Sequence, residues 1–123
     1  PFAQFTGIGN WLKSNTPKGA IVLHSDWDES PVLFYQNDWN YYIVGLDPTF
    51  MYEYNKDLYW KWVNITTGKG VDNMTEVIKN ELRVQYVLAT SDHQDMDKLF
   101  RDNKDFEKAY EDEDGKIYKI KDL

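Results

Sequence analysis

Carboxylate and imidazole side chains follow three segments that the sequence predicts to be strands. The first segment is followed by His24-Ser25-Asp26-Trp27-Asp28-Glu29, the second by Asp47, and the third by Ser91-Asp92-His93. Carboxylates of this kind could hold a hard divalent cation, and a nearby histidine would extend the choice to manganese or zinc. The same acidic residues could instead be solvated loop side chains that favour the positive end of a following helix. Both interpretations stay open.

Aromatic residues suggest a second kind of chemistry. The chain has five Trp, nine Tyr and six Phe, and twelve of these twenty lie between Trp27 and Trp62. Exposed tryptophan and tyrosine rings stack on sugars, whereas a stripe of aromatics at helical spacing usually belongs to a core. Trp27 and Trp39 have polar neighbours and are surface candidates. The stripe four residues apart, which we expect in the core, is Phe50, Tyr54, Leu58 and Trp62.

Composition and motifs argue against several function classes. Fourteen basic and twenty-one acidic residues give a net charge of −7, which disfavours nucleic acid as a partner. Cysteine is absent, so thiol catalysis and thiolate metal sites are excluded. The sequence has no Gly-x-Ser-x-Gly elbow, phosphate-binding glycine loop or His-Glu-x-x-His motif. We therefore assign no catalytic residue to the chain itself.

The elements that must position these side chains follow from periodicity and turn residues. Apolar, β-branched runs predict strands at 20–24, 40–45 and 85–90, and helical spacing predicts helices at 4–15, 30–37, 48–66 and 73–82. Asn73 with Glu76 fits a capping box, and Ser91 or Asp92 is the expected cap of a last helix whose inward face is Met96, Leu99 and Phe100. A hairpin at 106–121 closes the chain, and we expect its acidic turn, 111–114, to be solvated.

This order of elements predicts one α/β domain over residues 1–123. The expected architecture is a three-layer sandwich with a mixed, mostly parallel sheet of about five strands and a C-terminal β-hairpin. The carboxyl ends of parallel strands share one edge of a sheet, which is the usual ligand site in open α/β folds. Both histidines and several carboxylates should therefore meet at that edge.

Several runs resemble a known group of membrane enzymes. The run Asn10-Trp11-Leu12-Lys13-Ser14-Asn15-Thr16-Pro17-Lys18-Gly19-Ala20-Ile21-Val22 resembles the point where multi-pass membrane glycosyltransferases pass from their last transmembrane helix into a C-terminal domain. Residues 25–28, 42–50, 109–112 and 115–120 are similar to such domains in oligosaccharyltransferase-like and protein-mannosyltransferase-like proteins of bacteria and archaea. Of the Trp-Trp-Asp-Tyr-Gly motif of oligosaccharyltransferases only Trp27-Asp28 is present, followed here by Glu29-Ser30.

The resemblance implies a membrane-attached domain on the extracytoplasmic side that forms part of a larger polypeptide. Its partners would be the transmembrane part of the same chain and a glycan or other acceptor. The domain would bind acceptor or cap the membrane-embedded active site, and it would not be catalytic alone. The substrate-binding residues we expect are His24, Asp26, Trp27, Asp28, Glu29 and Asp47. The alternatives are a stand-alone module that binds carbohydrate or a divalent cation, and a small independent enzyme.

Overall fold

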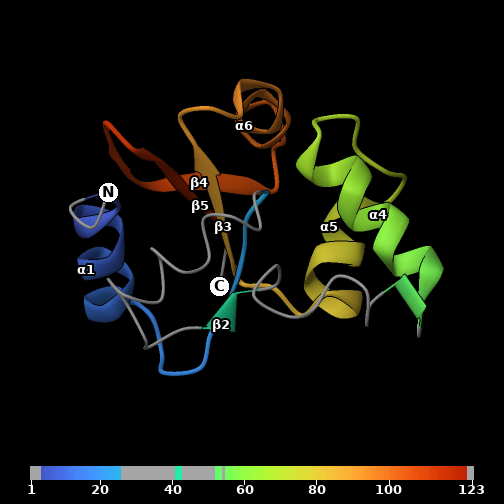
Figure 1. Cartoon of the computed structure of the whole chain (residues 1–123), viewed down its shortest axis with the longest axis horizontal. Coiled ribbons are helices and arrows are strands. Elements are labelled where there is room, and N and C mark those ends of the chain that lie inside the picture. The colour runs from blue at the N-terminus through green and yellow to red at the C-terminus, as the bar shows by residue number, and fades with distance from the viewer. Residues whose placement is uncertain (1–3, 26–40, 43–51, 54, 122–123) are drawn as a thin grey trace.

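A computed structural model describes residues 4–25, 41–42, 52–53 and 55–121. The helices in these ranges are α1 (Thr6–Asn15), α4 (Lys56–Thr66), α5 (Met74–Glu76) and α6 (Gln94–Arg101), and a π-helical turn over Val77–Glu81 extends α5. The strands are β1 (Ile21–Leu23), β2 (Tyr41–Tyr42), β3 (Tyr86–Thr90), β4 (Phe106–Asp112) and β5 (Gly115–Ile120). Figure 1 shows α1 on one side of the sheet and α4 with α5 on the other.

The strands form a mixed sheet in the order β2-β1-β3-β5-β4. β1 pairs in parallel with β2 and β3, while β5 runs antiparallel to β3 and to β4. The α/β class, the mixed sheet and the C-terminal hairpin are thus confirmed. β2 has only two residues, so the described ranges contain four longer strands instead of the five expected. Two strand pairings are parallel and two are antiparallel, so the sheet is not mostly parallel. The reason is that β5 turns back from β4 and inserts beside β3.

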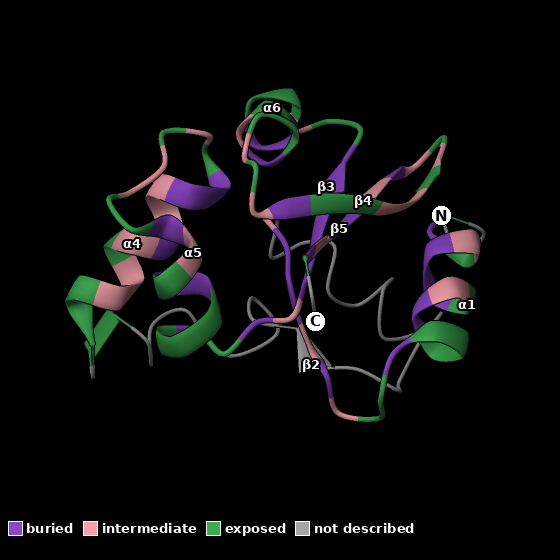
Figure 2. Ribbon diagram, turned by 180° about the vertical axis from the view of Figure 1, so that it is seen from behind, coloured by how far each residue is buried: buried purple, intermediate pink, exposed green. Residues whose placement is uncertain are grey.

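Side chains alternate between the two faces of the central strands, so each face carries an apolar cluster. On one face, Val22 and Leu88 pack with Ile8 and Leu12 of α1. On the other face, Val87 and its neighbours pack against α4, α5 and α6 through a set that includes Ile65, Ile78, Met96 and Phe100. Figure 2 shows the buried side of α1 turned toward the sheet. The sheet is therefore covered by helices on both faces.

Helix α4 begins and ends at the residues that local chemistry favours. The side-chain oxygen of Asn55 accepts a hydrogen bond from the Leu58 N–H at 3.0 Å, which satisfies a free donor of the first turn. Gly68 and Gly70 follow the helix with φ of 86° and 77°, a region that other residues rarely adopt. The predicted inward positions are confirmed for Trp62, which is buried, and Leu58, which packs on the core. Phe50 and Tyr54 lie outside the described residues, as does the helix expected at 30–37.

Two predicted helix caps are wrong. Asn73 precedes α5 with φ of 53° and makes no side-chain cap, because this left-handed backbone turns its side chain away from the free N–H groups. Glu76 instead accepts a hydrogen bond from the side chain of Asn80. His93, rather than Ser91 or Asp92, precedes α6, also without a side-chain cap. The inward faces themselves are as predicted, since Met74, Val77, Ile78, Leu82, Met96 and Phe100 are all buried and Leu99 packs on the core.

A buried carboxylate on α6 was not predicted. Asp97 is 2% exposed. One of its oxygens accepts a hydrogen bond from the Tyr118 hydroxyl at 2.7 Å, and the other accepts from Lys116 Nζ at 3.0 Å and Arg101 Nη1 at 3.1 Å. Burial and the neighbouring carboxylate raise the pKa of Tyr118. Two cations and a hydroxyl thus give the buried Asp97 carboxylate a partner on each of its oxygens.

Replacing Asp97 by alanine should destabilise the fold by about 3–5 kcal/mol, because it leaves two cations and a buried hydroxyl without their shared acceptor. The free energy of unfolding in urea measures this loss. Asp95→Ala is the control on the same helix, since Asp95 is exposed. It should cost less than about 1 kcal/mol through the helix dipole alone. Equal losses in the two variants would contradict the role given to Asp97.

Candidate functional site

The predicted rim at the carboxyl edge of the parallel strands is described only in part. β1 and β3 are parallel, with Val22 opposite Tyr86 and Leu23 opposite Val87, so their carboxyl ends do share one edge. His24 follows β1 at that edge and is fully buried. The other five predicted site residues, Asp26, Trp27, Asp28, Glu29 and Asp47, lie outside the described residues. Their convergence with His24 therefore stays a prediction.

The second histidine of the rim has a local role. His93 Nδ1 lies 2.6 Å from Thr90 Oγ1 and shares a hydrogen bond with it. This contact joins the end of β3 to the start of α6. At the end of β1, the hydroxyl oxygen of Ser25 is buried and has no hydrogen-bond partner among the described residues. The described ranges contain no group of three or more carboxylate or imidazole side chains able to hold a metal ion.

The start of α1 is fastened to the turn of the β4–β5 hairpin. The N–H of Phe5, a residue only 2% exposed, donates to Asp114 Oδ2 at 3.0 Å. A Cβ on Gly7 would lie 2.5 Å from both Tyr110 Oη and Asp112 Oδ2, so glycine lets helix and hairpin approach closely. We call these five residues, Phe5, Gly7, Tyr110, Asp112 and Asp114, the α1 anchor.

The hairpin turn is also hydrogen-bonded to the residue that follows β3. The Ser91 N–H donates to the backbone oxygen of Asp114 at 2.9 Å, and the Ser91 hydroxyl donates to that of Glu113 at 2.6 Å. Asp112 Oδ1 accepts from the Asp114 N–H at 2.8 Å. The acidic turn is therefore not simply solvated, because its carboxylates organise the turn and the start of α1. As a result, α1 begins at the same edge at which β3 ends (Figure 1).

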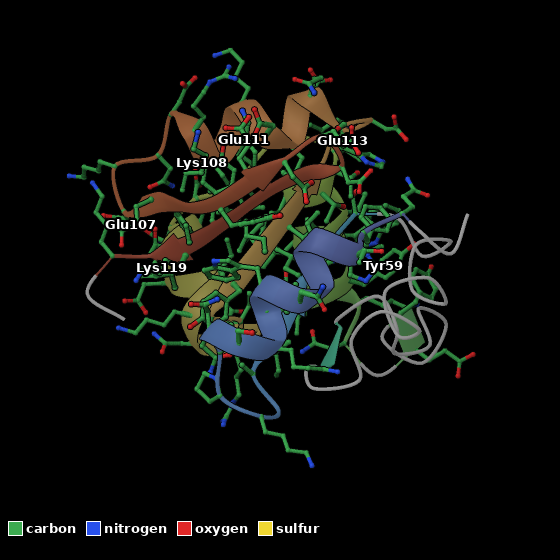
Figure 3. All side chains as sticks on the ribbon, turned by 90° about the vertical axis from the view of Figure 1, so that its left-hand side faces the viewer. Tyr59, Glu107, Lys108, Glu111, Glu113 and Lys119 are labelled. Atoms are coloured by element: carbon green, nitrogen blue, oxygen red, sulfur yellow. The ribbon has the colours of Figure 1, made fainter. Side chains whose placement is uncertain are left out.

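Charged side chains along the outer strand of the hairpin are mostly paired. Lys108 Nζ lies 2.6 Å from Glu111 Oε1, and Lys119 Nζ lies 3.5 Å from Glu107 Oε1. Figure 3 labels these four residues along the hairpin. Lys108 holds the pKa of Glu111 below its ordinary value. Pairs this exposed contribute little to stability, so they chiefly set the charge pattern of this face.

An exposed aromatic cluster lies at the beginning of α4. Trp60 is 53% exposed and Tyr52 is 40% exposed, and their ring centroids are 6.5 Å apart. Tyr59 contacts both rings edge-on, at 5.3 Å from Tyr52 and 5.2 Å from Trp60. Lys56 Nζ lies 5.0 Å from the centre of the Tyr52 ring. These rings form a polar-rimmed aromatic surface.

Sequence reasoning missed Trp60 as a surface residue. The signal was present, because Trp60 is two positions from both Leu58 and Trp62, and two helical positions amount to about 200° of rotation. If Leu58 and Trp62 face the core, then Trp60 must face away from it. Trp27 and Trp39, the surface candidates chosen from the sequence, lie outside the described residues.

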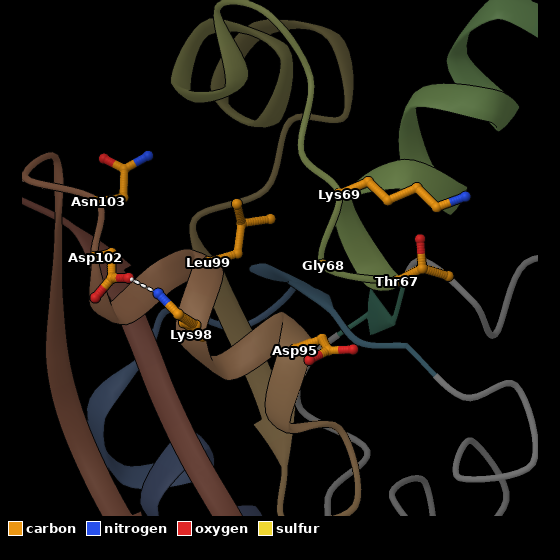
Figure 4. A pocket seen from close by; sticks show the side chains of 8 residues that line it. All are labelled: Thr67, Gly68, Lys69, Asp95, Lys98, Leu99, Asp102 and Asn103. Atoms are coloured by element: carbon orange, nitrogen blue, oxygen red, sulfur yellow. Dashed lines mark hydrogen bonds and ion pairs between the residues drawn. The ribbon is translucent and has the colours of Figure 1, made fainter.

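A groove of about 670 Å³ separates the end of α4 from α6 (Figure 4). Its floor is close-packed, since a Cβ on Gly68 would lie 2.7 Å from the backbone of Asp95. One wall carries an ion pair between Lys98 and Asp102 at 2.6 Å, which lowers the pKa of Asp102. The groove gathers no set of side chains suited to catalysis. We regard it as the packing seam between the two helices.

Comparison with protein-family models, with curated proteins and with solved structures finds no match to this chain. No helix within the described ranges is long and apolar enough to cross a membrane. The arguments for function therefore come from the residues and their geometry.

Replacing Asp114 by alanine should leave the buried Phe5 N–H without its acceptor and cost about 1–3 kcal/mol. Amide hydrogen exchange should show faster opening at the start of α1 than in β3. Glu113→Ala is the matched control in the same turn, because only the backbone oxygen of Glu113 is used. If Glu113→Ala loosened α1 as much as Asp114→Ala, the carboxylate would have no part in the anchor.

The α1 anchor should also give a titration signal at high pH. The hydrogen bond to Asp112 is the main cause that raises the pKa of Tyr110 from 10.0 to about 12. The stabilisation from this bond is therefore present below pH 10 and is lost as the pH rises through about 12. In ultraviolet titration, Tyr110→Phe should remove one late-titrating tyrosine. If the absorbance change near pH 12 were the same in Tyr110→Phe, the raised pKa of Tyr110 would be contradicted.

Proposed function

We propose that this chain is the extracytoplasmic C-terminal domain of a membrane glycosyltransferase-like protein. It would bind the acceptor or cap the membrane-embedded active site, and it would not be catalytic alone. The observation that carries the proposal is the α1 anchor, which fixes the start of α1 at the carboxyl edge of β3. The sequence runs quoted above supply the family resemblance.

The anchor determines where a preceding segment would meet the domain. Because Phe5 is bonded to the hairpin turn, polypeptide on its N-terminal side approaches at the carboxyl edge of the sheet. A transmembrane segment on that side would turn the same edge toward the membrane. This edge carries His24 and is continuous in sequence with Asp26, Trp27, Asp28 and Glu29. The predicted binding residues would then face the membrane-embedded part of the protein, as a cap requires.

The exposed aromatic cluster supports a glycan as the bound acceptor. Trp60 and Tyr52 keep much of their apolar surface in water, which is unfavourable unless a partner covers it. The faces of sugar rings are apolar while their edges are polar, so a sugar matches aromatic rings that have charged neighbours. Lys56 and Asp57 supply such neighbours on the same helix. The same observation favours the alternative of a stand-alone carbohydrate-binding module.

The complete architecture is also part of the proposal. Apolar clusters cover both faces of the sheet, with α1 on one face and α4, α5 and α6 on the other. We propose that the whole domain, residues 1–123, is a three-layer sandwich.

Fractionation of the source cells tests the proposal directly. An antibody raised against this chain should detect a band much larger than 14.6 kDa in the detergent-soluble membrane fraction. A band near 14.6 kDa in the soluble fraction would overturn membrane attachment and leave the stand-alone module. Washing the membranes with high salt and alkali before detergent is the control, because it removes proteins that adhere only to the surface.

A further inference from the structure

A small polar pocket lies at the carboxyl edge of β3, between α6 and the hairpin. Its volume is about 270 Å³. It is formed by the end of β3, the first turns of α6 and the two hairpin strands next to their turn. The polar residues that line it are Thr90, Ser91, Gln94, Asp97, Glu111, Asp112 and Lys116. Asp112 also belongs to the α1 anchor, so the pocket opens at the edge that the proposed function turns toward the membrane.

Lys116 is a hydrogen-bond donor in the wall of this pocket. Its Nζ donates one hydrogen bond to the buried carboxylate of Asp97 at 3.0 Å. A lysine ammonium has three N–H donors, and Lys116 makes no other hydrogen bond within the described part of the chain. Arg101 and Tyr118 hold the carboxylate from the other sides. Lys116 is thus fixed in place with donors left over for a ligand.

An acceptor lies next to this donor. Glu111 lies directly opposite Lys116 across the hairpin, so both side chains lie on one face of the sheet. Glu111 Oε1 accepts a hydrogen bond from Lys108 Nζ at 2.6 Å, and the Glu111 side chain is about half exposed. A carboxylate oxygen can accept two hydrogen bonds, so acceptor capacity remains.

The charges of the wall select the ligand. Each of the charges around the pocket has an opposite partner, because Asp97 is bonded to Lys116 and Arg101, and Glu111 is bonded to Lys108. A charged ligand would have to displace one of these ion pairs, whereas a neutral ligand leaves them in place. A hydroxyl group both donates and accepts, so it can satisfy Lys116 and a carboxylate together. Pockets for drug-sized ligands hold about 300–1,000 Å³, so this one fits a single small ring.

We propose that this pocket is a subsite for one neutral sugar residue, with Lys116 as donor and Glu111 as acceptor. The assignment of that sugar to the acceptor rests on the proposed function. The subsite is separate from the aromatic cluster on α4, since the two sets of lining residues have no member in common.

Titration of the isotope-labelled 123-residue chain with sugars tests the subsite by NMR. The probes are glucose, mannose and N-acetylglucosamine, with glucuronate and glucose 6-phosphate as charged counterparts. At least one neutral sugar should shift the amide signals of Ser91, Gln94 and Gly115, and the charged counterparts should bind more weakly. If no neutral sugar shifts these signals, or if a charged one binds as tightly, the proposal is overturned.

Variants of two lysines on β5 provide the matched comparison. Lys116→Met should weaken sugar binding about tenfold by removing a charged donor. Lys119→Met should leave binding unchanged, because Lys119 pairs with Glu107 at the far end of the hairpin. Should Lys116→Met unfold the chain, Glu111→Gln answers the same question, since Glu111 is half exposed and does not touch Asp97. Equal effects of the two lysine variants, or no effect of Glu111→Gln, would overturn the subsite.

The outcome separates this inference from the proposed function. If the parent protein is membrane-bound but sugars do not shift the amide signals of this domain, the subsite is wrong and the membrane proposal still holds. If the protein is a soluble 14.6 kDa chain that binds a neutral sugar through Lys116, the subsite is supported and membrane attachment is wrong.

Discussion

The turn of the C-terminal hairpin joins the parts of this fold that are farthest apart in sequence. Asp114 uses its side chain to bind the Phe5 N–H and its backbone oxygen to bind the Ser91 N–H. Gly115 makes this approach feasible, because a Cβ there would lie 2.7 Å from the backbone oxygen of Ala89. One tight turn therefore fixes the first helix, the central strand and the hairpin relative to one another. The carboxyl edge of the sheet owes its shape to these bonds.

The second constraint is the charge that the fold buries. Replacing an ion pair such as Asp97 and Lys116 by apolar residues would often stabilise a protein, so the pair is weak evidence of a purely stabilising role. It does hold α6 on the hairpin, because two of the three donors to the Asp97 carboxylate, Lys116 and Tyr118, come from β5. The polar pocket between α6 and the hairpin is lined by both Asp97 and Lys116.

Much of the fold could be predicted from periodicity, and the failures have physical causes. The runs Ala20–His24 and Gln85–Thr90 contain β1 and β3, and the inward residues of the helices are those that spacing indicated. The caps failed because the left-handed backbone at Asn73 overrides its side-chain preference. Asp97 was missed because a charged residue in a helix reads as solvated until its partners, 19 and 21 residues away, are brought beside it. Of the predicted site, only His24 is placed by the described residues.

The α1 anchor has a consequence for how much of the time the domain would be bound to a partner on its N-terminal side. A domain on a free linker explores all orientations, and most encounters present the wrong face. In the proposed membrane-attached protein, the edge at the attachment point would stay close to the preceding segment, so binding there would be intramolecular, with effective concentrations on the order of millimolar for short linkers. A single-sugar subsite of modest intrinsic affinity would then be filled for much of the time without any tighter contacts.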